Sequence, residues 1–116
     1  MAEEERPAWE GNKDLYSAAS EVSKNLIALF RLATGAMQAN DLKAWWVHLD
    51  SAYIEADFSI KEVDRIKLDA LWKKINPKDK RSYGLLKEYH LELRRLCKPF
   101  FQMIGERGDP RTAVYR

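Results

Sequence analysis

Apolar residues recur every three or four positions along most of the chain, the spacing that places them on one face of an α-helix. The first run occupies residues 13–39 and has apolar residues at Leu15, Ala19, Val22, Leu26, Leu29, Ala33 and Met37. Asn12 precedes this run as a favourable N-cap, and Asp14 lies in its first turn, where the helix dipole favours a negative charge. The pattern therefore predicts a helix over residues 13–39.

Two shorter helices are predicted in the middle of the chain. Asn40 and Asp41 end the first helix and cap a second over residues 42–57. The apolar face of this second helix consists of Leu42, Trp46, Leu49, Tyr53 and Ala56. Ser59 and Glu62 have the spacing of a capping box, in which each side chain accepts a free N–H at a helix start, so a third helix is predicted over residues 60–75. Its main apolar positions are Val63, Ile66 and Ala70, with Leu68, Leu71, Trp72 and Ile75 in addition.

A fourth helix is predicted over residues 77–104. Asn76 can cap it, and Pro77 is tolerated at the first helical position because the N–H that proline lacks would have no partner there. The apolar stripe of this helix consists of Tyr83, Leu86, Tyr89, His90, Leu93, Cys97, Phe100 and Ile104. Pro99 interrupts the stripe and is expected to kink the helix.

The order and lengths of these elements define the expected fold. The chain has 116 residues with only five Gly and four Pro, and it contains no Asn-Gly or Asp-Gly hairpin signal. These features predict one all-α domain over residues 12–105, flanked by irregular tails at 1–11 and 106–116. Because two long helices bracket two shorter ones, a four-helix up-and-down bundle is expected.

Composition and single residues narrow the chemistry. The longest apolar run, residues 26–30, is far shorter than the roughly 20 residues of a membrane span, and the acidic start of the chain is unlike a secretory signal. A cytoplasmic location without membrane contact is therefore expected. One cysteine, Cys97, and two histidines, His48 and His90, are too few for a Cys/His zinc site. Neither histidine lies in a catalytic motif, so no catalytic residue, metal or cofactor is expected.

The apolar faces are wider than a small bundle requires. On the first helix they span roughly 220°, whereas a surface helix needs little more than about 100°. Four helices cannot bury all of this surface internally, which predicts a homo-oligomer. The residues assigned to self-association are Ile27, Ala28, Leu32, Gly35, Ala39, Val47 and Ile54. The alternative is that an uneven bundle buries these residues itself, with Trp9 and Tyr115 folded over its edges.

The formal net charge of +2 hides an asymmetry along the chain. Residues 1–58 contain five Lys or Arg and ten Asp or Glu, whereas residues 59–116 contain fifteen and eight. The two halves can neutralise each other, within one bundle or between subunits, because they come within a Debye length in such a small domain. The excess of positive charge can also form a surface for nucleic acid or an acidic partner.

The basic residues of the second half concentrate at two places. Those within roughly 40° of one another on the predicted fourth helix are Lys80, Lys87, Arg94 and Lys98. Those around the turn before it are Lys73, Lys74, Lys78 and Arg81. Trp72 is expected to project away from the main face of the third helix, near these lysines. Basic residues along a helix can follow phosphates, and an aromatic side chain can stack on an unpaired base.

Together these patterns predict a non-catalytic, oligomeric helical scaffold or accessory subunit that acts through protein–protein interaction. The alternative is a nucleic-acid-binding accessory protein that uses the basic edge of the fourth helix and the turn before it. The two hypotheses differ in whether charge reversal at Lys87 and Arg94 removes nucleic-acid retention.

Overall fold

A computed structural model describes residues 13–106, with side chains over residues 17–102. The elements are α2 (Lys13–Gln38), α3 (Leu42–Ala56), η1 (Asp57–Ser59), α4 (Glu62–Lys74), η2 (Lys80–Ser82), α5 (Tyr83–Leu96) and α6 (Lys98–Glu106). No strand occurs within residues 13–106, which confirms the all-α prediction. The predictions for tail residues 1–11 and 107–116, including Trp9 and Tyr115, lie outside the described residues.

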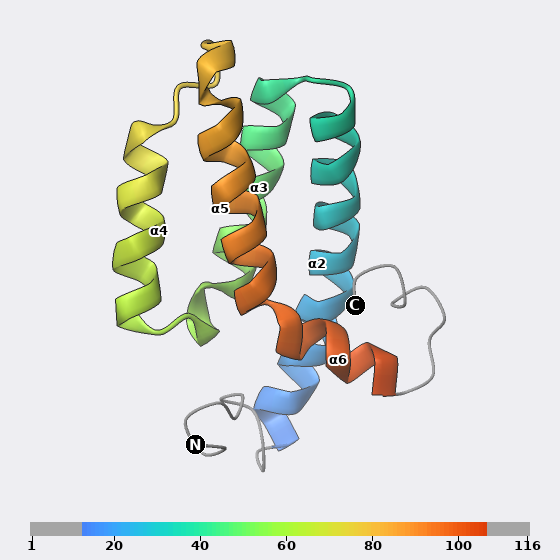
Figure 1. The fold of residues 1–116 in the computed structure, drawn as a ribbon. Helices are drawn as coiled ribbons and strands as arrows, with labels where there is room; N and C mark the ends of the chain where they lie inside the picture. The colour runs from blue at the N-terminus through green and yellow to red at the C-terminus, as the bar shows by residue number, and fades with distance from the viewer. Residues whose placement is uncertain (1–12, 107–116) are drawn as a thin grey trace.

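The helices pack mainly with their neighbours in the chain. α2 and α3 lie side by side and run in opposite directions, and α4 and α5 form a second antiparallel pair (Figure 1). α5 also packs against α3, and α6 turns away from α5 to cross α2. The apolar side chains of all five helices meet in one core.

The turn between α2 and α3 follows the sequence signal at Asn40 and Asp41. Asn40 has φ 59°, in the left-handed region that asparagine tolerates better than most residues. The Asp41 carboxylate accepts the N–H of Ala44 at 3.1 Å, which satisfies one of the free donors at the start of α3. Both the break and the cap were therefore predicted from these two residues.

The corner between α3 and α4 differs from the predicted capping box. The Ser59 hydroxyl donates to the carbonyl of Ala56 at 3.0 Å, and α4 begins at Glu62 without a side-chain cap. The capping-box prediction is wrong because Ser59 belongs to η1 and its hydroxyl bonds to a carbonyl earlier in the chain, not to an N–H of α4. Arg65 holds this corner instead, since its guanidinium pairs with the Asp57 carboxylate and donates to the carbonyls of Asp57 at 3.3 Å and Ile60 at 3.4 Å.

The predicted fourth helix is divided into two. α5 starts at Tyr83, after a turn in which Asn76 donates its N–H to the Ser82 hydroxyl at 2.9 Å, so the predicted start at Pro77 is wrong. α5 ends at Leu96, with Cys97 as its C-cap two residues before Pro99, because a proline has no N–H to continue the ladder and its ring crowds the carbonyl four residues earlier. The resulting bend is sharp enough for α6 to leave α5 and pack against α2.

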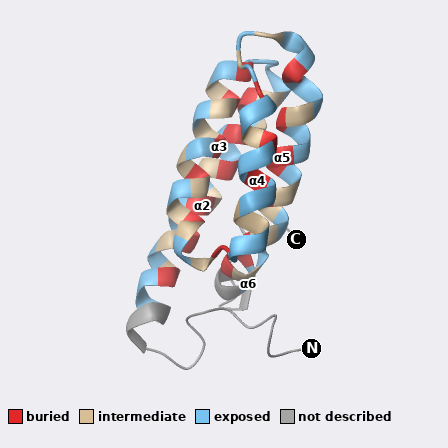
Figure 2. Cartoon of the chain, turned by 90° about the vertical axis from the view of Figure 1, so that its left-hand side faces the viewer, coloured by how far each residue is buried: buried red, intermediate tan, exposed pale blue. Residues whose placement is uncertain are grey.

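The buried faces of two helices differ from those predicted. On α3 the buried residues are Leu42, Trp45, Leu49, Ala52 and Ala56, while Trp46 and Tyr53 are half-buried. On α4 the core side carries Leu68, Leu71 and Ile75. Val63 is 71% exposed and Ile66 is 63% exposed, so the main face predicted for this helix is wrong. The side of α4 with the leucines, Ile75 and Trp72 buries more apolar surface than the side with Val63 and Ile66 would, which favours it as the core side. Figure 2 shows mostly exposed residues along the opposite side.

Candidate interaction surfaces

The outer α2/α3 face consists of Ala28, Leu32, Gly35, Ala39, Val47 and Ile54. All six are exposed, with Leu32 at 53%, Val47 at 44% and Ile54 at 65%. The seventh residue assigned to self-association, Ile27, is half-buried and packs against the core. The structure therefore brings six of the seven to the surface on two adjacent helices.

The pairing of α2 and α3 places these apolar residues at matching heights. The Asn25 amide donates to the Glu55 carboxylate at 3.2 Å and so marks one level of the antiparallel pair. Leu32 lies seven residues after Asn25. Because α3 runs in the opposite direction, the matching position on α3 lies seven residues before Glu55, at residue 48, beside Val47. Leu32 and Val47 thus belong to one continuous surface across both helices.

The small residues of the outer α2/α3 face leave room for a close approach. A Cβ added at Gly35 would meet no heavy atom within 4 Å, so packing inside the chain does not require glycine there. Ala28 and Ala39 are likewise exposed and add little bulk. A helix from outside can therefore approach the α2 backbone closely along this face.

The predicted basic residues separate into two groups. One group lies at the end of α4 and in the connection to α5 and comprises Lys73, Lys74, Lys78, Lys80 and Arg81, all exposed. Within it the Arg81 guanidinium is held by the Asp79 carboxylate, with Nη2 and Oδ2 3.0 Å apart. The other group follows α5 and comprises Lys87, Arg94 and Lys98, of which Arg94 is half-buried.

Arg31 of α2 extends the second basic group. Lys87 and Arg94 lie on the flank of α5 away from α4, because Glu92 on the other flank contacts Lys67 of α4. Arg31 is exposed and follows Phe30, whose ring lies 5.5 Å from that of His90 on α5. It lies about 120° around α2 from Asn25, on the flank away from α3. The spacing of basic residues along α5 could not indicate Arg31, because Arg31 lies on α2.

Trp72 lies among aromatic side chains of the core side. Its ring stacks on that of Trp46, with centroids 5.1 Å apart and planes at 8°, and its centroid lies 5.0 Å from that of Tyr89. Trp72 is half-buried in this arrangement. The stack therefore joins α3, α4 and α5 and separates Trp72 from the surface lysines with which the sequence associated it.

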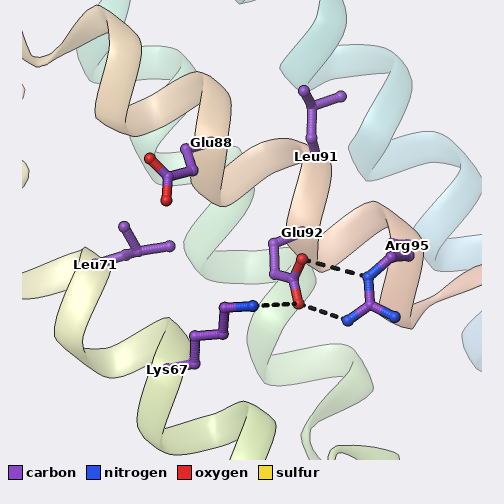
Figure 3. Close-up of a pocket in the computed structure, with 6 residues that line it drawn as sticks. All are labelled: Lys67, Leu71, Glu88, Leu91, Glu92 and Arg95. Atoms are coloured by element: carbon purple, nitrogen blue, oxygen red, sulfur yellow. Dashed lines mark hydrogen bonds and ion pairs between the residues drawn. The ribbon is translucent and has the colours of Figure 1, made fainter.

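A hollow of about 290 Å³ lies between α4 and α5, and the sequence had not pointed to it. Figure 3 shows its lining, which consists of Lys67, Leu71, Glu88, Leu91, Glu92 and Arg95. Glu92 Oε2 lies 2.6 Å from Arg95 Nη2 and 3.6 Å from Lys67 Nζ. The hydrogen bonds from Arg95 lower the pKa of the Glu92 carboxyl, whose charge the two cations balance. This cluster is best described as a contact that ties α4 to α5.

The two groups with the strongest pKa changes are buried. His90 is 2% exposed, and burial together with the nearby charge of Arg94 lowers its pKa to about 4. Cys97 is fully buried, and burial raises the pKa of its thiol to about 12. Each group therefore stays neutral near neutral pH, as expected of core residues.

Residues 13–106 contain no group of three or more His, Cys, Asp and Glu side chains placed to bind a metal. No helix in this range combines the length and the apolar character needed to cross a membrane. Comparison of the chain with models of known protein families, with curated proteins and with solved structures finds no match in any of the three.

Proposed function

We propose that the protein is a non-catalytic helical scaffold or accessory subunit that self-associates through the outer α2/α3 face. The observation that carries this proposal is the exposure of Leu32, Val47 and Ile54 beside the small residues of the same face. In this proposal α2–α5 act as a four-helix up-and-down bundle to which α6 is added. Among residues 17–102, no side chain covers the large apolar residues of the outer α2/α3 face.

Three large side chains in each copy determine how much free energy the outer α2/α3 face can contribute to association. Complete burial of such a side chain contributes about 1.5–3 kcal/mol, and Leu32, Val47 and Ile54 are each roughly half exposed. Their remaining burial would therefore contribute about 1 kcal/mol each, against the loss of translational and rotational freedom on association. About 3 kcal/mol per copy does not by itself offset the roughly 4–15 kcal/mol that association costs, so the proposed oligomer is expected to be weak and concentration-dependent.

Gly35 supplies a test that leaves the core intact. Gly35→Leu places a large side chain on the outer α2/α3 face, where nothing in the chain itself obstructs it. Gly84→Leu is the matched control, because Gly84 is also exposed, has equally open space and lies on α5. Light scattering after size exclusion should show a smaller assembly for Gly35→Leu and an unchanged one for Gly84→Leu. An unaltered Gly35→Leu oligomer would remove α2 from the interface.

Nucleic-acid binding is a second candidate function, and one observation favours it. Exposed Arg31 follows Phe30 on α2, whose ring contacts that of His90 on α5, the helix that carries Lys87 and Arg94. A positive surface of this kind can contact phosphates without reading sequence.

A further inference from the structure

We propose that self-association is head-to-tail, with the outer α2/α3 face of one copy seated on the outer face of α4 in a second copy. The outer α4 face is defined by Val63, Ile66 and Ala70. This inference rests on the proposed self-association and specifies its geometry. It predicts that every copy uses two different surfaces.

The outer α4 face is the second apolar surface of the described chain. Val63, Ile66 and Ala70 follow one another at helical spacing, and all three are exposed, Val63 at 71%. They lie on the side of α4 opposite Leu68 and Ile75, which enter the core. Packing among residues 17–102 therefore does not account for Val63 and Ile66.

The two apolar faces lie on different sides of the molecule. α4 and α2 form opposite edges, with α5 and α3 between them (Figure 1). A two-fold dimer joins one surface to the same surface of its partner, so a dimer through α2/α3 would leave the outer α4 face uncovered. Head-to-tail contacts use both faces of each copy, and they close into a ring if the rotation between copies permits it.

The shapes of the two faces complement each other. The outer α2/α3 face has small residues at Ala28, Gly35 and Ala39, with open space above Gly35. The outer α4 face presents the branched side chains of Val63 and Ile66, which project from a single helix. A ridge of branched residues fits a lane of small ones, as in ridges-into-grooves helix packing.

The charges of the two halves also favour unlike surfaces. Over residues 13–58 six Asp or Glu outnumber four Lys or Arg, whereas over residues 59–106 twelve Lys or Arg outnumber seven Asp or Glu. Beside the faces themselves the charges are mixed, because exposed Lys43 as well as Asp50 lies one turn from Val47, and the exposed residues next to the outer α4 face are Glu62, Asp69, Lys73 and Lys74. Head-to-tail contact brings halves of opposite net charge together, whereas a two-fold contact opposes halves of the same sign.

A mixing experiment separates the head-to-tail arrangement from a two-fold one. Ile54→Glu disables the outer α2/α3 face, and Ile66→Glu disables the outer α4 face, both at exposed positions where the fold should persist. Circular dichroism and thermal unfolding check that each variant is folded. The molar mass of each variant, and of an equal mixture, is then measured by light scattering.

Head-to-tail assembly predicts that both variants are monomeric alone and form a dimer of about twice the monomer mass when mixed, because each supplies the face that the other lacks. The head-to-tail proposal is overturned if folded Ile66→Glu assembles like the unmodified protein, or if the mixture stays monomeric. A monomeric unmodified protein, or an unaffected Ile54→Glu, overturns the proposed self-association itself. The two failures are thus distinguishable.

Discussion

The indole N–H of Trp45 donates to Nδ1 of His90 at 2.9 Å, joining α3 to α5 inside the core. Because Nδ1 accepts this bond, the imidazole is neutral and carries its proton on Nε2. The His90 ring also meets the rings of Phe30 and Trp45 edge-on, at 5.5 Å and 5.9 Å between centroids. This histidine therefore packs and hydrogen-bonds within the core as the neutral imidazole, a protonation state that depends on pH.

The free energy of unfolding should fall as the pH decreases from about 6.5 to about 4. In this window the unfolded chain binds a proton at His90 and the folded chain does not, because burial lowers the folded pKa to about 4. The difference between the two pKa values corresponds to at most about 3 kcal/mol. Urea unfolding at a series of pH values measures it.

His90→Gln isolates this contribution, because glutamine can still accept the indole N–H of Trp45 but does not titrate in this range. Its unfolding free energy should depend less on pH than that of the unmodified protein. His48→Gln, at a half-buried position of α3, is the control, and its unfolding free energy should keep the pH dependence that His90 contributes. Equal pH dependence in His90→Gln and the unmodified protein would contradict this role of His90.

Adjacent tryptophans should respond differently to the same substitution. Trp45→Phe removes the donor to His90 and leaves a buried acceptor unpaired, which costs about 1–3 kcal/mol. Trp46→Phe removes an indole N–H that has no hydrogen-bond partner within the described residues, and it keeps an aromatic ring against Trp72. Chemical unfolding should show the larger loss for Trp45→Phe. A larger loss for Trp46→Phe would contradict the assignment of these two side chains.

Cys97 should be protected from thiol reagents in the folded protein. Its side chain is fully buried, and burial raises the pKa of the thiol to about 12, which keeps the nucleophilic thiolate scarce. Labelling with a chromogenic disulfide should be slow in buffer and rapid in denaturant. Rapid, complete labelling under native conditions would show that the junction of α5 and α6 opens readily.

The second candidate function predicts a salt-dependent interaction with nucleic acid. If Lys87 and Arg94 contact phosphates, the double variant Lys87→Glu, Arg94→Glu should lose retention on single-stranded DNA without a change in subunit number. Arg31→Ala should reduce the slope of log affinity against log salt by roughly 0.7 for one phosphate contact. Lys61→Glu, at the N-cap of α4 and outside both basic groups, is the control. Retention that survives the double variant would exclude this basic surface.

The sequence predicted the turn at Asn40 and Asp41 better than it predicted the other helix starts or the faces that the helices bury. Asn40 and Asp41 act locally, so their turn could be predicted without knowledge of the rest of the chain. On α4 two apolar sides compete, and the choice between Val63 and Leu68 depends on which side the neighbouring helices cover. The break at Cys97 follows from Pro99, but the direction of α6 depends on tertiary contact with α2.

The candidate surfaces show the same limit. Helical spacing predicted that Leu32, Val47 and Ile54 lie off the main stripes, and all three are exposed. The contact of the Phe30 ring with the His90 ring, which brings Arg31 of α2 near α5, could not be predicted because it joins residues distant in the sequence. Trp72 was associated with lysines near it in the chain, whereas its ring stacks on Trp46 from another helix.

The most direct test of self-association is the molar mass of the purified protein by light scattering, over a range of concentrations at low and high salt. The proposed function predicts an oligomer that persists at high salt because its interface is mainly apolar, that Leu32→Glu reduces to monomer and that Leu91→Glu leaves intact. Leu91 is a matched control, since it is 54% exposed but lies on α5. A monomer of unmodified protein at every concentration and salt would contradict the central claim.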